Sequence, residues 1–362
     1  MTAPTRYMLS PEVVLTGPGC WHATSSVVEK FGRRTLALGD AAGLAAVTSL
    51  LESLEERRIA VQGRTFEGEC TEAAIASVAR GARGFDAMIG IGGGKAIDTA
   101  KAAAAAATIP CVTIPTSPAT CAAYTPLSII HDMRGGYIES RRLPTPVAAM
   151  ILDPELMISA PARLLSAGCI DALARSWDTL LAARAGVPFS MAALSLAACR
   201  QIWDETLRPL SAQAIDDNLA GTVTPAFTAV VEACITGAGL AGQLGARFFG
   251  RSFSHALGYA LAGFVDNAVV LHGEAVGLGV LLQCALDAES TVSLPDMAAY
   301  FRSWGAPTQF ADLGFEGLEG ERGQTLASAT YDLLDLDAAV PFPVTAEEIH
   351  QGLLAVEEVN SA

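Results

Sequence analysis

The chain has 362 residues and a net charge of −15, because 38 Asp and Glu outnumber 23 Lys and Arg. An acidic chain without a basic stripe argues against a nucleic acid partner, since binding would need Lys and Arg to neutralise phosphates. The length exceeds what one hydrophobic core usually organises, so we expect two domains. Hydrophobic residues make up 51% of the chain and charged residues only 17%, which predicts large buried helix and subunit interfaces and therefore a homo-oligomer.

The first part of the chain alternates short apolar runs with amphipathic stretches, a βαβ pattern. The expected strands cover residues 13–15, 35–38, 60–61 and 87–89, and the expected helices cover 41–57 and 71–83. Beyond Pro154 the strand signals fade, and long Ala- and Leu-rich helical segments continue to the C-terminus. We therefore predict an α/β plus all-α fold, with a Rossmann-like domain over residues 1–157 and a helical domain over 158–362.

The uncharged segment 102–130 could be mistaken for a membrane span, but four prolines interrupt it, and we expect buried core instead. The eight cysteines are scattered singly, without a C-x-x-C pair, and the first residues do not have the pattern of a secretory leader. We therefore expect a cytoplasmic protein without a membrane partner.

Three consecutive glycines, Gly92, Gly93 and Gly94, follow a buried strand and precede Lys95 and a helix. Glycine lets the backbone approach a pyrophosphate closely, and the free amides at a helix N-terminus donate to it. The segment is not a P-loop, because Ala96 stands where Ser or Thr would hold magnesium, and it departs from G-x-G-x-x-G at Lys95. A plain strand-to-helix turn is the alternative, but three glycines with a lysine favour a phosphate cradle.

Asp40 follows the second expected strand. A carboxylate at this strand end can accept hydrogen bonds from an adenosine ribose and repel a 2′-phosphate, which favours NAD over NADP. The alternative is an ordinary turn aspartate before a helix.

Two of the five histidines, His255 and His272, lie in apolar, Gly- and Ala-rich surroundings, and Asp171 is an isolated carboxylate in an apolar helix start. A lone histidine on an apolar helix is more often a core residue, but a buried, unpaired Asp171 would be costly, and a divalent cation would remove that cost. Arg175 lies four residues after Asp171, so a regular helix places both on one face, where the guanidinium could bind a substrate carboxylate. The alternative for Arg175 is an exposed helix arginine.

The segment from Gly92 to Lys101 resembles the Gly-Gly-Gly-Lys-x-x-Asp-x-x-Lys signature of the iron-containing alcohol dehydrogenase superfamily, in its glycerol dehydrogenase branch. The resemblance implies a dehydroquinate synthase-like fold whose first domain binds NAD and whose helical domain binds the metal and the substrate. It also implies the residues that contact the cofactor, namely Asp40, Gly92, Gly93, Gly94, Lys95, Asp98, Thr116, Thr125, Leu127 and His131.

The same resemblance implies that Asp171, His255 and His272 are the metal ligands and the catalytic residues. Three protein ligands leave an open coordination position for a substrate oxygen, as in catalytic zinc sites. Iron-type relatives carry a further histidine where this chain has Arg175, so we favour Zn²⁺, with Fe²⁺ as the alternative. His131 stands where relatives often have Tyr, and Gly258 where they often have a second His, which leaves the proton relay open.

Cys121 stands where glycerol dehydrogenases have an aspartate that helps to hold the polyol, and segments 119–128 and 237–248 resemble the bacterial hydroxycarboxylate dehydrogenase branch. With Cys121 and Arg175 as substrate residues, we predict an NAD(H)- and metal-dependent alcohol dehydrogenase or ketone reductase for a small 2-hydroxy or 2-oxo acid. The alternatives are a glycerol or other polyol dehydrogenase, a dehydroquinate synthase-like lyase, and a non-catalytic NAD-binding subunit.

Overall fold

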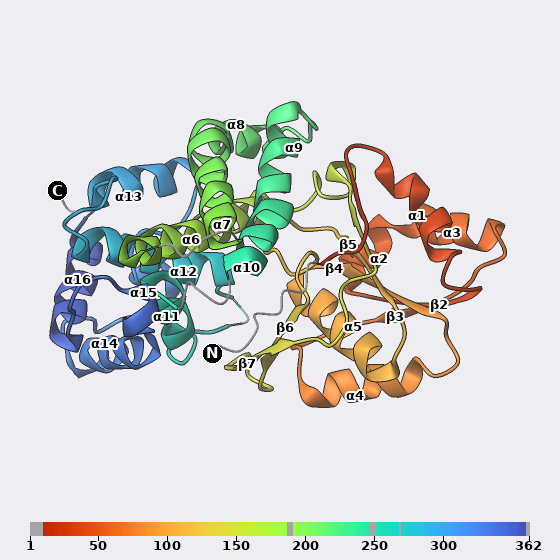
Figure 1. Ribbon diagram of the computed structural model, residues 1–362, viewed down its shortest axis with the longest axis horizontal. Helices are drawn as coiled ribbons and strands as arrows, with labels where there is room; N and C mark the ends of the chain where they lie inside the picture. Colours follow the sequence, from red (N-terminus) through yellow and green to blue (C-terminus); the bar gives the residue numbers. More distant parts are fainter. Residues whose placement is uncertain (1–9, 187–190, 246–250, 268, 360–362) are drawn as a thin grey trace.

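The computed structural model describes residues 10–186, 191–245, 251–267 and 269–359. A sheet with its covering helices forms one side of the molecule and a helical assembly forms the other (Figure 1). The α/β plus all-α fold class is thereby confirmed. The last strand of the sheet ends at Leu152 and the first long helix begins at Ala162, whereas the predicted domain boundary at 157/158 stays a prediction.

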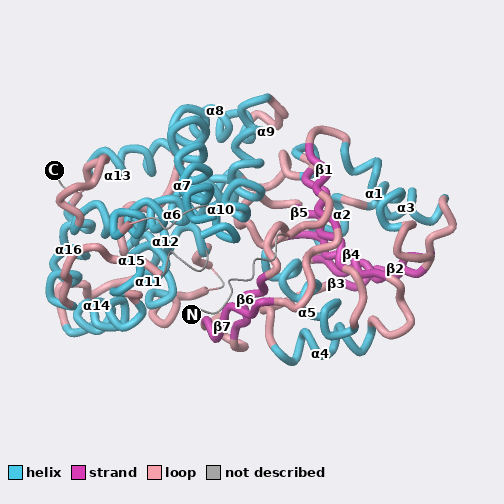
Figure 2. The backbone as a smooth tube through the Cα atoms, viewed as in Figure 1, coloured by secondary structure: helices cyan, strands magenta, loops and turns pink. Residues whose placement is uncertain are grey.

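Within the described residues, six parallel strands form the main sheet (Figure 2), and their order is β1-β8-β5-β4-β2-β3. Their bounds are β1 Val14–Thr16, β2 Arg34–Gly39, β3 Ala60–Thr65, β4 Ala87–Gly92, β5 Cys111–Pro115 and β8 Ala149–Leu152. Helices on both faces bury the strands, so β4, β5 and β8 are buried along their whole length and mostly apolar. Along β2, Leu36 packs with the helices of one face and Ala37 with those of the other, which is the two-residue period of a strand.

The helices of this half are α1 Thr24–Val28, α2 Ala41–Ala46, α3 Thr48–Glu56, α4 Glu72–Gly81 and α5 Gly94–Ala107. The helix predicted over 41–57 is two helices, because the backbone leaves helical geometry at Val47 (φ −112°, ψ 19°). Helices α4 and α5 cover one face of the sheet, and α1 and α3 cover the other.

A two-stranded antiparallel hairpin, β6 Leu127–His131 with β7 Tyr137–Arg142, was not predicted. The sequence of β7 contains one glutamate and two arginines and is mostly exposed, so it lacks the apolar run by which the other strands are recognised. The hairpin lies between the sheet and the helical half (Figure 2).

The helical half begins with α6, which is central and mostly buried. Its helices are α6 Ala162–Ala182, α7 Met191–Arg200, α8 Arg208–Leu219, α9 Pro225–Glu232, α10 Ala238–Gly245, α11 Phe253–Leu261, α12 His272–Leu286, α13 Leu294–Ser303, α14 Glu321–Leu333, α15 Leu336–Ala339 and α16 Ala346–Glu358. Short 3₁₀ turns lie at Cys20–Ala23, Pro154–Leu156, Ala183–Ala185 and Ala311–Leu313, and π-helical turns at Gln201–Leu207 and Ala233–Gly237.

In the described part of the chain, one continuous helical stretch has the length and apolar composition of a membrane span. It runs over Pro225–Gly245, from α9 through a π-helical turn to α10, and 61% of its most apolar 18 residues are buried inside the fold. Core helices of soluble proteins have the same properties, so this helix carries little weight as a span. The uncharged segment 102–130 forms the end of α5, strand β5 and the first part of β6, not one long helix.

Candidate active site

A cavity of 1170 Å³ lies where the carboxyl ends of the parallel strands face the helical half. Strands β2, β4 and β5 end at this edge because parallel strands point the same way, and such edges are where open α/β sheets bind ligands. All of the predicted site residues except Gly92 line the cavity; these are Asp40, Gly93, Gly94, Lys95, Asp98, Thr116, Cys121, Thr125, Leu127, His131, Asp171, Arg175, His255 and His272.

The glycine turn joins β4 to α5 and is tied to Asp40. Gly92 has φ +118°, and a Cβ there would lie 2.2 Å from Asp40 Oδ2, so only glycine fits. The Gly93 amide donates to Asp40 Oδ2 (3.2 Å), and the Gly43 amide donates to Asp40 Oδ1 (2.6 Å). Asp40 therefore caps α2 and positions the turn while it lines the cavity, so its role as a turn residue does not exclude a role towards a ligand.

Lys95 is the second residue of α5 and has an acidic partner that the sequence did not indicate. Its Nζ lies 2.5 Å from Glu69 Oε1, and both residues line the cavity. Glu69 Oε2 is buried and has no hydrogen-bond partner among the described residues. The cradle is therefore less positive than the lysine alone would make it.

Asp98 and Lys101 form a buried ion pair (2.8 Å) beneath the loop that leads into β6. Lys101 Nζ donates to the carbonyl oxygens of Ala122 (2.6 Å), Thr125 (3.0 Å) and Leu127. Asp98 also accepts a hydrogen bond from the Ile129 amide (2.9 Å). The pair fixes the loop that brings Cys121, Thr125 and Leu127 to the cavity, which is a structural task in addition to any contact of Asp98 with a ligand.

Thr116 and His131 lie on either side of this loop. The Thr116 amide donates to the Gly92 carbonyl (3.2 Å), which holds the end of β5 against the glycine turn. Burial lowers the pKa of His131, and its Nδ1 is buried without a hydrogen-bond partner in the described residues. A neutral imidazole with a free ring nitrogen is therefore available to a ligand at neutral pH.

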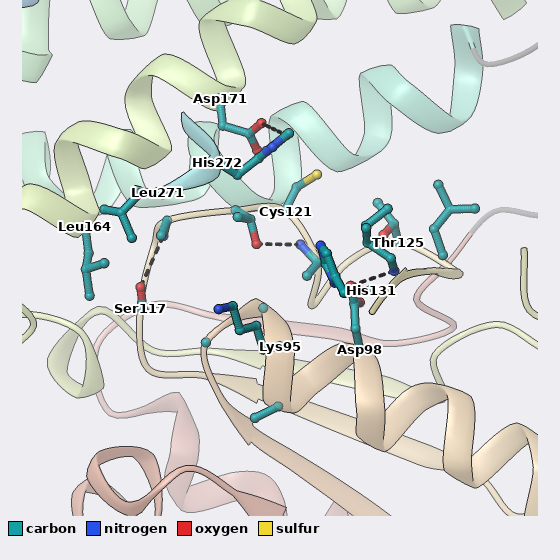
Figure 3. Close-up of a pocket in the computed structure, with 18 of the residues that line it drawn as sticks. Lys95, Asp98, Ser117, Cys121, Thr125, His131, Leu164, Asp171, Leu271 and His272 are labelled. Atoms are coloured by element: carbon teal, nitrogen blue, oxygen red, sulfur yellow. Dashed lines mark hydrogen bonds and ion pairs between the residues drawn. The ribbon is translucent and has the colours of Figure 1, made fainter. Parts of the chain in front are cut away.

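Asp171 and His272 face each other across the cavity from Lys95 (Figure 3), and His255 completes a group of three candidate metal ligands from three helices. The ligand atoms of these residues all lie within 4.8 Å of one another, and His272 Nε2 is 3.4 Å from Asp171 Oδ1. Burial lowers the pKa of His272 to about 4, so the imidazole is neutral, as a metal ligand must be. One carboxylate and two imidazoles are a donor set for a divalent cation such as Zn²⁺ or Fe²⁺, so the residues fit the metal that the sequence predicts.

Arg175 lies one turn along α6 from Asp171 and faces the cavity, so it is not an exposed helix arginine. Its one hydrogen bond within the described residues joins Nη2 to His255 Nε2 (3.3 Å). Burial raises the pKa of the neighbouring Cys121 thiol to about 12, so this side chain stays neutral and does not offset the guanidinium. A guanidinium beside the three candidate metal ligands, Asp171, His255 and His272, can bind an anionic group of a small molecule.

Two further cavity residues, Asp178 and Tyr259, were missed from the sequence. Asp178 Oδ2 lies 2.8 Å from His255 Nδ1. Tyr259 stacks between Tyr137 of β7 (4.3 Å) and His272 (5.9 Å). Helical spacing could have found both, because Asp178 lies two turns after Asp171 and Tyr259 one turn after His255.

A family model described as iron-containing alcohol dehydrogenase matches residues 11–154. Over 323 residues, the chain is 30% identical to a glycerol dehydrogenase from Pseudomonas putida, and the match covers 87% of each protein. The chain belongs to the iron-containing alcohol dehydrogenase family. Within this family the glycerol dehydrogenase-like branch that the glycine signature indicates is confirmed.

One further relative and one solved structure are similar to this family member. Hydroxycarboxylate dehydrogenase A from Escherichia coli (strain K12) is 33% identical over 68% of this chain and 68% of its own. The crystal structure of a probable glycerol dehydrogenase from Sinorhizobium meliloti 1021 superposes with a TM-score of 0.84 at 27% identity, covering 97% of this chain and 98% of that one. The chain thus spans nearly the whole length of a solved family member.

Proposed function

We propose that the chain is an NAD(H)-dependent, divalent-metal-dependent alcohol dehydrogenase or ketone reductase that acts on a small 2-hydroxy or 2-oxo acid. The observation that carries the acid preference is Arg175, whose guanidinium lies in the cavity 3.3 Å from His255 Nε2. A carboxylate next to a carbinol or ketone carbon would reach this guanidinium while the adjacent oxygen faces Asp171 and His272. Such a charge-assisted pair fixes the orientation of the substrate.

The cofactor would lie along the strand ends. The glycine turn at Gly93 and Gly94 leaves room for a pyrophosphate, since a Cβ at Gly93 would meet no atom within 4 Å. Asp40 supports NAD as the cofactor, and Thr116, Thr125, Leu127 and His131 line the cavity that also contains the candidate metal ligands. When bound, NAD would accept or return the hydride, and the divalent cation, Zn²⁺ or alternatively Fe²⁺, would polarise the substrate oxygen.

A glycerol or other polyol dehydrogenase is the second candidate. Several relatives are glycerol dehydrogenases, among them those from Pseudomonas putida and Thermotoga maritima. Cys121 weighs against it, because a neutral thiol cannot accept strong hydrogen bonds from polyol hydroxyls as a carboxylate would. We further propose that the protein is a cytoplasmic homo-oligomer whose partner is a small-molecule substrate.

The test is Arg175→Leu with matched substrates, a 2-oxo acid and the neutral ketone of the same carbon skeleton. Loss of a buried bidentate pair should raise KM for the acid about 100-fold, or ~2.7 kcal/mol, and change KM for the ketone only slightly. Arg142→Leu is the control, because Arg142 is an exposed arginine that also lines the cavity. An equal rise for both substrates in Arg175→Leu would rule out the carboxylate contact.

A further inference from the structure

Both nitrogens of the His255 ring have a fixed neighbour. Nδ1 lies 2.8 Å from Asp178 Oδ2, and Nε2 lies 3.3 Å from Arg175 Nη2. The side chains of His255 and Asp178 are only 6% and 3% exposed, so water does not compete for these contacts. The ring therefore has one orientation, which the neighbours on α6 determine.

The two neighbours also select one tautomer. An ionised carboxylate only accepts hydrogen bonds and a guanidinium only donates them. The proton of a neutral His255 must then lie on Nδ1, where it is donated to Asp178, and Nε2 must keep its lone pair. This lone pair is the one that faces the cavity and that a cation would bind.

Asp178 has no freedom to turn away from this task. Its second oxygen, Oδ1, accepts the backbone amide of Ser254 (3.1 Å), the residue before His255 on α11. One carboxylate thus holds both the backbone and the ring of the same ligand. Along α6, Asp171, Arg175 and Asp178 are spaced by four and three residues and share one face of the helix.

We infer that Asp178 is the positioning residue of the metal site: it holds His255 as the Nδ1-protonated tautomer, with Nε2 aimed at the cation. This inference rests on the proposed function only for the presence of a divalent cation. Some carboxylates orient a metal-binding histidine by accepting a hydrogen bond from its other ring nitrogen. Substitution of such a carboxylate typically changes metal affinity 10–100-fold. Arg175 has the opposite effect, because it donates to the same lone pair that the cation needs.

The test is Asp178→Asn in the full-length protein, with Zn²⁺ or Co²⁺ affinity measured by competition with a chromophoric chelator. An asparagine cannot accept from both Nδ1 and the Ser254 amide, because one of its two groups is a donor. If its NH₂ faces the ring, His255 is forced into the Nε2-protonated tautomer, which cannot bind the cation. We expect an affinity about 10–100-fold weaker than that of the unaltered chain.

Asp153→Asn is the matched control. Asp153 is fully buried and also accepts two backbone amides, those of Trp21 and Glu155 at 3.0 Å each, but it does not line the cavity. The Asp153→Asn variant should lose thermal stability and keep the metal affinity of the unaltered chain. Arg175→Leu should bind the cation at least as tightly as the unaltered chain. Affinity of Asp178→Asn within twofold of the unaltered chain would overturn the inference and leave the proposed function standing, whereas an unaltered chain that binds no divalent cation would overturn both.

A second measurement observes the ring in the unaltered chain. Long-range ¹H–¹⁵N correlation spectra of metal-free protein labelled at its five histidines report the tautomer of each ring. With His255 assigned through His255→Gln, the inference requires the Nδ1–H form. An Nε2–H form for His255 in the unaltered chain would overturn it.

Discussion

At the scale of single residues, Asp40 shows how one side chain can serve the fold and the cavity together. It caps α2 through the Gly43 amide (2.6 Å) and holds the glycine turn through the Gly93 amide (3.2 Å). Each of its oxygens keeps a lone pair for another donor, such as a ribose hydroxyl. Its negative charge would repel a 2′-phosphate, and its hydrogen bonds stabilise the fold.

Asp40→Ser removes the charge and keeps the cap. Serine is as good a helix N-cap as aspartate, so the protein should stay folded although the contact with the Gly93 amide is lost, while the charge that repels a 2′-phosphate is removed. We expect the ratio of kcat/KM for NADPH to that for NADH to rise about tenfold, or ~1.4 kcal/mol. The control is Asp335→Ser, the same change at the N-cap of α15 outside the cavity. An unchanged ratio in Asp40→Ser would mean that Asp40 is a structural residue alone.

The residues of the candidate site divide by the kind of signal that they leave in a sequence. Asp171 and His272 are recognisable because an isolated polar residue in an apolar helix needs a partner. Asp178 stands in the same apolar helix as Asp171, so its spacing could have found it, although its partner His255 lies 77 residues away. Glu69 left no such signal, because it meets Lys95, 26 residues away, only through the packing of distant elements.

At the scale of secondary-structure elements, the position of the metal-type ligands depends on how closely α6 and α12 cross. Gly273, next to His272, lies so near α6 that a Cβ would be 2.0 Å from the Ala167 carbonyl oxygen. This contact is with backbone, which cannot move aside as a side chain can. The crossing therefore sets the distance between Asp171 and His272.

Gly273→Ala should push α12 away from α6. We expect the free energy of unfolding to fall by about 1–3 kcal/mol, and the metal affinity to fall with it, because His272 moves away from Asp171. Gly242→Ala in α10 is the contrasting helix substitution, since its Cβ would make only ordinary contacts, at 3.7 Å or more, with Arg175. That variant should gain about 0.5–1 kcal/mol from helix propensity. Denaturant unfolding measures both, and equal stability of Gly273→Ala and the unaltered chain would contradict the close crossing.

Elements whose burial matches their sequence period could be predicted, and those defined by tertiary contacts could not. Strands β2 and β4 and helix α4 lie near their expected ranges. The two strands are mostly buried and apolar, and the helix has apolar residues at helical spacing on the face that packs on the sheet. The β6–β7 hairpin was missed since its polar, exposed β7 is stabilised by pairing with β6. The break at Val47 between α2 and α3 also left no Gly or Pro signal.

At the scale of the whole molecule, the cavity brings together two chemistries that lie far apart in the sequence. In the proposed function the strand ends and the glycine turn would bind a dinucleotide, and Asp171, His255 and His272 on α6, α11 and α12 would bind a cation. Tyr137 of the β6–β7 hairpin stacks on Tyr259 of α11 (4.3 Å), which joins the two halves beside the metal-type ligands. Catalysis by this family member would require both halves to be loaded at once.

The most direct test of the central claim is NADH consumption by the zinc-loaded protein on matched panels of 2-oxo acids, aldehydes and dihydroxyacetone, repeated after chelation. The account predicts turnover that is fastest with the 2-oxo acids and that is lost on chelation and restored by Zn²⁺, because Arg175 orients the acid beside Asp171, His255 and His272. Turnover led by dihydroxyacetone would contradict the acid preference and support a polyol dehydrogenase. Turnover that survives complete removal of the metal would contradict the metal-dependent reaction itself.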